Sequence, residues 1–196
     1  MKMSYNSKYG KWMAFAVAIV LFIGSGFYNW HVYQTNKSLE IQIKESVKNT
    51  ATVMLSELRN IENKASNLDM LSQENMKDMI RRIDNIYILA TTLPMPVNAA
   101  AEYPLTFVKQ VLFEYGIPTS ERNLKFTDEE MQDFIDLQLE HAYEVIDIVC
   151  TDQYKFNLNN YNNSLKKQAV AIQDKYEKVF KSKAYYDKYI VSAANR

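Results

Sequence analysis

Glu140, His141 and Glu144 are the side chains whose types and spacing come closest to a metal-binding set. Helical bundles that bind two iron or manganese ions use a Glu-x-x-His pair on each of two helices. Position 138, where His141 would need its glutamate, is a glutamine, and the chain holds one other histidine, His31. The spacing therefore predicts no metal site.

Acidic and basic residues are segregated in the second half of the chain. Residues 128–147 carry eight acids and no Lys or Arg, whereas residues 155–188 carry eight lysines and three acids. Two neighbouring helices of opposite charge would pair favourably, and this is the interpretation that we prefer. The alternative is that the acidic helix binds a cation or a docking partner.

Other signatures of catalysis are absent from the sequence. Cys150 follows Ile148 and Val149, which predicts a small buried side chain rather than a nucleophile. Gly116 is the only glycine after the apolar N-terminal segment, so a glycine-rich phosphate-binding loop is excluded. No nucleophile elbow or paired-cysteine motif occurs. We therefore predict that the protein is not an enzyme, with no catalytic residue and no cofactor.

The overall composition is that of a chain that buries a core and does not bind nucleic acid. Hydrophobic residues make up 47% of the chain. Lys plus Arg and Asp plus Glu number 23 each, so no net positive charge attracts DNA or RNA. A single cysteine cannot form an internal disulfide, and the fold must depend on packing.

An uncharged apolar segment lies near the N-terminus. A helix of the 19 residues from Trp12 to Trp30 is about 28 Å long, close to the roughly 30 Å of the bilayer hydrocarbon core. Aromatic rings stand at both of its ends, where membrane proteins place them. We expect residues 12–33 to be a transmembrane anchor in contact with the lipid bilayer. Its anchoring side chains are Trp12, Phe15, Val17, Ile19, Leu21, Phe22, Ile23, Phe27, Tyr28 and Trp30.

The charges that flank this segment predict its orientation in the cell membrane. Lys2, Lys8 and Lys11 precede it without any acid, whereas glutamates accompany the lysines that follow it. The positive-inside rule then makes residues 1–11 a cytoplasmic tail and residues 34–196 one extracytoplasmic domain.

A cleaved signal peptide, which would release a secreted helical protein, is the alternative to the anchor. Gly24-Ser25-Gly26 supplies small residues before a possible cut at Phe27. We prefer the uncleaved anchor, because the apolar run is longer than that of a typical signal peptide and glycines replace the usual alanines.

Glycines and prolines divide the rest of the chain into two helical parts. Beyond the apolar segment every glycine and proline falls within residues 94–126, and both residue types destabilise a helix interior. We expect a helical hairpin over residues 34–93, an irregular elbow over 94–126 with a short helix from about Pro104, and a second hairpin over 127–196. The predicted fold is all-α, with an N-terminal single transmembrane helix followed by an antiparallel bundle of about four to five helices.

Apolar residues in the first hairpin alternate at spacings of four and three. They are Val47, Ala51, Met54, Leu58, Ile61, Ala65 and Leu68. This heptad pattern is typical of helices that pack as in a coiled coil. The seam serves either packing within the chain or association with a partner, and the sequence leaves both open.

Capping residues mark two further helix starts. Ser72 is the expected N-cap of one helix, with Glu74 in its first turn. Thr127 and Glu130 have the spacing of a capping box. The apolar stripes that follow these caps are Met79, Ile83, Ile86, Ala90 and Leu93, and Met131, Ile135, Leu139, Ala142, Ile146 and Val149.

Protein–protein interaction is the function that these features favour, with the protein as a scaffold or an accessory subunit. Tyr185, Tyr186 and Tyr189 lie beyond the last apolar stripe and form a candidate surface for a protein partner. Self-association is the other form of this hypothesis. A small-ligand-binding or sensory accessory module, with a pocket between helices, is the alternative.

Overall fold

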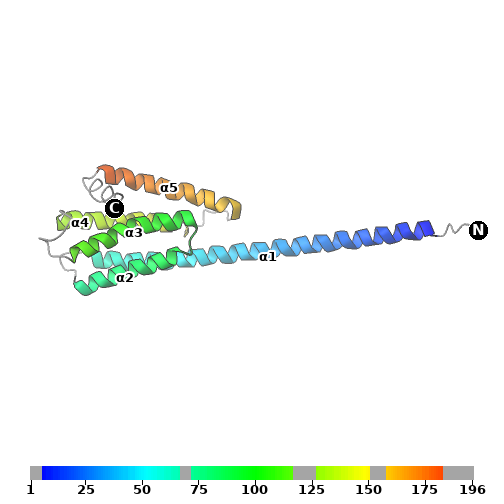
Figure 1. Ribbon diagram of the computed structural model, residues 1–196, viewed down its shortest axis with the longest axis horizontal. Coiled ribbons are helices and arrows are strands. Elements are labelled where there is room, and N and C mark those ends of the chain that lie inside the picture. Colours follow the sequence, from blue (N-terminus) through cyan, green and yellow to red (C-terminus); the bar gives the residue numbers. More distant parts are fainter. Residues whose placement is uncertain (1–5, 67–71, 117–126, 151–157, 183–196) are drawn as a thin grey trace, which may run out of the picture. The chain divides into compact units, whose positions relative to one another are not determined.

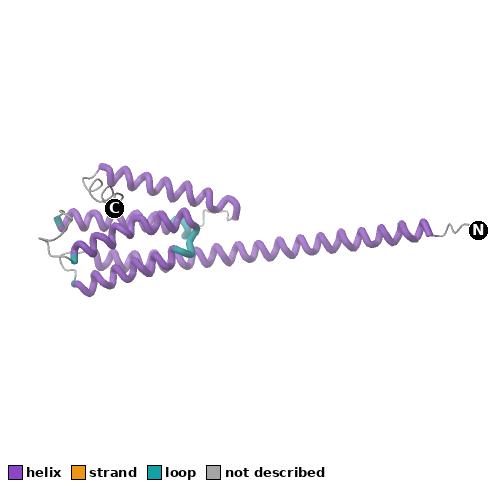
Figure 2. The backbone as a smooth tube through the Cα atoms, in the orientation of Figure 1, coloured by secondary structure: helices purple, strands orange, loops and turns teal. Residues whose placement is uncertain are grey.

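The structure, a computed structural model, describes residues 6–66, 72–116, 127–150 and 158–182. All regular secondary structure in these ranges is α-helical, which confirms the predicted fold class (Figure 2). The helices are α1 (Asn6–Ala65), α2 (Gln73–Ala90), α3 (Met95–Tyr115), α4 (Asp128–Asp147) and α5 (Leu158–Ser182) (Figure 1).

The chain divides into two compact units, Met1–Ile43 and Lys44–Arg196. The first contains the N-terminal part of α1, and the second contains the rest of α1 together with α2 to α5. In the first unit the large apolar side chains between Trp12 and Trp30 are exposed, from 43% at Ile19 to 80% at Phe22.

The second unit is an antiparallel helical bundle. Contacts between α1 and α2 join Glu57 to Arg82 and Lys64 to Asp78, so residue numbers rise along one helix as they fall along the other. The same order relates α2 to α3 and α4 to α5. Helix α3 packs against α2, α4 and α5 (Figure 1).

The predicted caps and apolar stripes are present in this bundle. The Ser72 hydroxyl accepts a hydrogen bond from the Asn75 backbone N–H. Thr127 and Glu130 form the reciprocal capping box at the start of α4. All the stripe residues predicted on α2 and α4, together with Leu93 just beyond α2, are buried. Local capping and periodicity therefore determine where these two helices begin and which face they bury.

The prediction of an irregular elbow over residues 94–126 is wrong for residues 95–115, which form helix α3. Helix α3 begins at Met95, well before the short helix expected from Pro104. The Pro94 carbonyl accepts hydrogen bonds from the Val97 and Asn98 N–H groups, and Pro96 lies in the first turn, where a missing N–H breaks no helical hydrogen bond.

Pro104 lies inside α3, where it cannot donate to the Ala100 carbonyl. Alanines before it favour the helix. Val97, Ala100, Ala101 and Leu105 are also buried against the core, so tertiary packing supports a helix that the prolines alone argue against.

The matched isoleucines Ile83 and Ile88 of α2 test the core. Ile83 is 0% exposed and Ile88 is 68% exposed. We expect Ile83→Ala to lower the free energy of unfolding by about 2–5 kcal/mol through a buried cavity, and Ile88→Ala to change it by less than about 0.5 kcal/mol. Urea unfolding of the detergent-solubilised chain, followed by far-UV circular dichroism, measures both. Equal losses for the two variants would contradict the described burial.

Candidate functional site

The predicted anchor is an apolar helix surface without a protein cover. All ten predicted anchoring side chains are exposed. The rings of Trp12 and Phe15 pack edge to face at one end, and those of Phe27 and Trp30 do so at the other. Helix α1 is long and apolar enough to cross a membrane, and none of its most apolar window is buried. Apolar surface in water costs about 25 cal/mol per Å², so this exposed surface is consistent with membrane anchoring.

The heptad seam, by contrast, is already occupied within the chain. Val47 is 8% exposed, and the next five seam residues, from Ala51 to Ala65, are 0% exposed. They belong to the hydrophobic core of the bundle, so they are not available to a partner while the bundle is folded. Leu68, at the end of the seam, and the candidate partner surface Tyr185, Tyr186 and Tyr189 lie outside the described residues.

Glu140, His141 and Glu144 do not converge on a metal position. The His141 ring is 1% exposed and stacks on Tyr176 of α5, with 4.5 Å between ring centroids and an interplanar angle of 12°. Glu144 accepts a hydrogen bond of 3.0 Å from the Tyr176 hydroxyl and pairs with Lys175, whereas Glu140 is exposed. Within the described ranges no cluster of three or more His, Cys, Asp or Glu side chains could hold a metal ion.

The ion pair between Lys175 and Glu144 joins the acidic helix α4 to the lysine-rich helix α5. This contact agrees with the interpretation that opposite charges on the two helices favour their pairing. Because the lysine is 53% and the glutamate 35% exposed, solvent screens the pair and its contribution to stability is at most about 1 kcal/mol. The aromatic contacts between α4 and α5 therefore carry more of the packing.

A buried polar pair on α4 was not predicted from the sequence. Gln138 is 0% and His141 is 1% exposed, and within the described structure neither side-chain amide atom nor either ring nitrogen has a hydrogen-bond partner. Each such group costs about 1–3 kcal/mol. The available signal was the spacing of Phe134, Gln138, His141 and Val145, which repeats four, three, four and marks a second buried stripe.

Burial also controls the ionisation of His141 and of Tyr176, on which it stacks. It lowers the pKa of His141 to about 4, with Glu144 opposing the shift and Lys175 adding to it. Burial, together with the hydrogen bond to Glu144, raises the pKa of the Tyr176 hydroxyl. Both groups are therefore neutral near pH 7, and they act in packing.

Cys150 lies three residues beyond the C-terminal end of α4 and is partly buried against the core. Burial raises the pKa of its thiol. A nucleophilic cysteine needs a lowered thiol pKa, so this environment keeps Cys150 in the unreactive thiol form.

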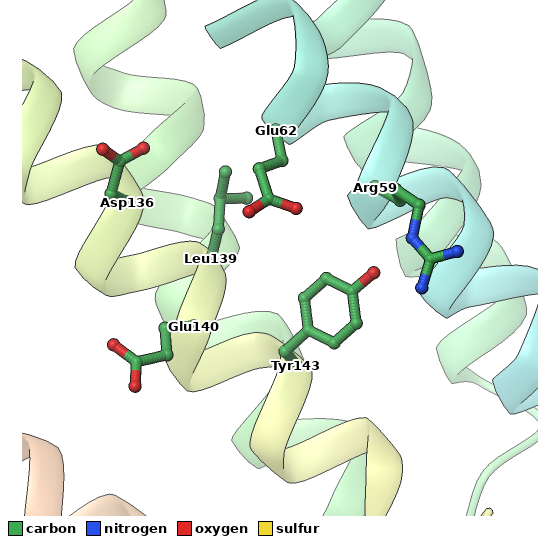
Figure 3. Close-up of a pocket in the computed structure, with 6 residues that line it drawn as sticks. All are labelled: Arg59, Glu62, Asp136, Leu139, Glu140 and Tyr143. Carbon is green, nitrogen blue, oxygen red and sulfur yellow. The ribbon is translucent and has the colours of Figure 1, made fainter. Parts of the chain in front are cut away.

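A cavity of about 370 Å³ lies between α1 and α4 in the second unit. Arg59 and Glu62 line it from α1, and Asp136, Leu139, Glu140 and Tyr143 line it from α4 (Figure 3). The Tyr143 hydroxyl donates a 3.1 Å hydrogen bond to the Leu55 carbonyl, which fixes its ring. Partial burial raises the pKa of Asp136, and the negative charge of Glu62 adds to the shift. The lining thus holds three acids against one arginine.

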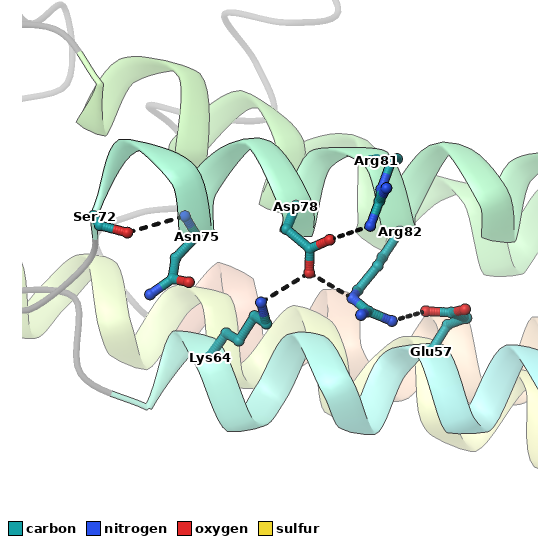
Figure 4. Close-up of polar contacts among 7 residues, drawn as sticks. All are labelled: Glu57, Lys64, Ser72, Asn75, Asp78, Arg81 and Arg82. Atoms are coloured by element: carbon teal, nitrogen blue, oxygen red, sulfur yellow. Dashed lines mark hydrogen bonds and ion pairs between the residues drawn. The ribbon is translucent and has the colours of Figure 1, made fainter.

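A cluster of charges between α1 and α2 has a structural role (Figure 4). Asp78 Oδ2 lies 2.9 Å from Lys64 Nζ and 2.8 Å from Arg82 Nε, and Asp78 also pairs with Arg81. Arg82 Nη1 in turn lies 2.6 Å from Glu57 Oε2. The Lys64 ammonium, followed by the Arg82 guanidinium, holds the pKa of Asp78 well below its usual value. These charges satisfy one another across the helix pair.

His141 makes the stability of the bundle depend on pH. In the unfolded chain the imidazole takes up a proton below its ordinary pKa of 6.5, whereas the folded chain resists protonation down to about 4. Unfolding therefore becomes easier as the pH falls from 6.5 to 4, by up to about 3 kcal/mol. We expect His141→Phe, which keeps a stacked ring, to remove this component, and His31→Phe to retain it. Denaturant unfolding across this pH range checks both, and parallel curves for His141→Phe and the parent chain would contradict the assignment.

No protein-family model, curated protein or solved structure matches this chain. Its function has to be argued from the placement and chemistry of its own residues.

Proposed function

We propose that the protein is a single-pass membrane protein whose extracytoplasmic helical bundle acts by binding other proteins, as a scaffold or an accessory subunit. Residues 1–11 form the cytoplasmic tail, residues 12–33 cross the bilayer, and residues 34–196 lie outside the cytoplasm. The observation that carries the proposal is the uncovered apolar surface from Trp12 to Trp30. The lysines before it supply the orientation.

The environments of the reactive side chains support binding rather than catalysis. His141 is stacked and buried, the Cys150 thiol has a raised pKa, and Asp78 is neutralised by its basic neighbours. Catalysis needs polar groups that converge on a position open to a substrate. These three residues lie at separate places in the bundle and are occupied by packing or pairing.

A matched pair of cysteine variants tests the topology. In a Cys150→Ala background, we expect Ser38→Cys to react with a membrane-impermeant maleimide on intact cells, and Ser7→Cys to react only after permeabilisation. Intact mass of the mature chain accompanies the labelling. Labelling of Ser7→Cys on intact cells would reverse the orientation, and a mature chain that begins at Phe27 would establish the secreted alternative.

Small-ligand binding is a second candidate function, which the cavity between α1 and α4 favours. Its volume of about 370 Å³ falls within the roughly 300–1,000 Å³ typical of ligand sites. Glu62, Asp136 and Glu140 outnumber Arg59 in the lining, and the Tyr143 ring offers a face for a cation. A small organic cation is the ligand class that fits this chemistry.

Thermal unfolding in the presence of putrescine or choline tests this second candidate. We expect either amine at millimolar concentration to raise the unfolding temperature by a few degrees, and Glu62→Gln combined with Glu140→Gln to remove the rise. Glu129→Gln, an exposed position on α4 outside the cavity lining, is the control and should retain it. The same temperature with and without amine in the parent chain would reject the cation site.

A further inference from the structure

A second heptad repeat lies in the first unit, on the part of α1 that precedes the bundle. Its members, which we name the α1 stripe, are spaced four, three, four, three and four. They are Ser25, Asn29, Val32, Asn36, Leu39 and Ile43. Val32 is partly buried and the other five are exposed. Leu39 at 49% and Ile43 at 44% exposure are apolar side chains that the chain itself leaves largely uncovered.

The α1 stripe is distinct from the buried seam of the bundle. The seam begins at Val47, four residues after Ile43, although the alternation of four and three requires a step of three there. Such an insertion interrupts a heptad repeat and shifts its phase. The interruption coincides with the boundary between the two units, at Ile43 and Lys44. The stripe is therefore a separate packing surface.

The residue types on the stripe favour a second copy of the chain as the partner. In heptad notation Asn29, Asn36 and Ile43 occupy position a, and Val32 and Leu39 occupy position d. Leu39 at d and Ile43 at a are the residue types that favour two parallel strands, and an asparagine at a, such as Asn36, specifies register at a cost in stability. An asparagine amide both donates and accepts hydrogen bonds, so it is complementary to the same residue on an identical, parallel helix.

The flanking residues permit this pairing. Positions e and g beside the stripe are occupied by Tyr28, Tyr33, Thr35, Glu40 and Gln42. In a parallel dimer Glu40 faces Thr35 of the second copy, so no like charges oppose one another.

We propose that residues 25–43 form a parallel, two-stranded coiled coil with a second copy of this chain. The inference rests on the proposed membrane anchor, which makes both copies enter the bilayer in the same direction and brings equal residues to equal depth. The dimer buries the exposed Leu39 and Ile43 and pairs each Asn36 amide with its counterpart.

Face-specific cross-linking of the full-length chain in its membrane tests the proposal. Single cysteines are introduced in the Cys150→Ala background at the stripe, as Asn36→Cys and Leu39→Cys, and on the opposite helix face, as Ser38→Cys and Ile41→Cys. Under mild oxidation we expect the two stripe variants to form a species of twice 22.9 kDa at least fivefold faster than the two controls. Equal rates at all four positions, no cross-link, or a product of another mass would overturn the proposal.

A second variant and an extraction assay separate this inference from the proposed function. Leu39→Glu places two like charges in the dimer interface and should abolish the dimer found by chemical cross-linking, while Ile41→Glu should leave it intact. Alkaline carbonate extraction reports whether each chain remains in the membrane. If the chain stays in the membrane but cross-links equally on both helix faces, the coiled coil is rejected and the membrane anchor is retained. If carbonate extracts the chain but the stripe variants still cross-link, the membrane anchor is rejected and the coiled coil is retained.

Discussion

The apolar surface of α1 between Trp12 and Trp30 is the constraint on which the other features depend. These side chains are exposed in the described structure, and an apolar surface of this extent is unfavourable in water. A lipid bilayer covers it without any further protein, and a helix is the conformation that satisfies all its backbone hydrogen bonds inside hydrocarbon. In the proposed function, this anchoring would determine the compartment of the bundle and the direction of the chain across the bilayer.

Features that depend on local periodicity could be predicted from the sequence. The buried helix faces agree with the apolar spacing, as in the seam from Val47 to Ala65 and the stripes of α2 and α4. The starts of α2 and α4 agree with the caps Ser72 and Thr127. Both features depend on neighbours only three or four residues away. Helix α3 could not be predicted in this way. The prolines at its start and centre indicate a break, and only packing of Val97, Ala101 and Leu105 in the core explains the continuous helix.

The candidate sites needed the tertiary arrangement. Gln138 and His141 have polar side chains, which sequence reasoning assigns to the surface, yet both are buried, and the His141 ring stacks on Tyr176 of α5. The cavity brings Glu62 and Asp136 together from segments far apart in the chain, and no local pattern encodes that distance. Single-sequence periodicity identifies which face of a helix is buried, but not which residues of other helices it meets.

The buried amide of Gln138 and the buried imidazole of His141 also influence how the bundle unfolds. Detachment of α5 would expose the His141 ring to water and would break its stacking on Tyr176 together with the partly solvated ion pair between Lys175 and Glu144. Exposure to water would also remove the free-energy cost of burying ring nitrogens that have no hydrogen-bond partner. Opening at α5 therefore costs less than opening of an interface of the same apolar area that contains no unpaired buried polar atoms.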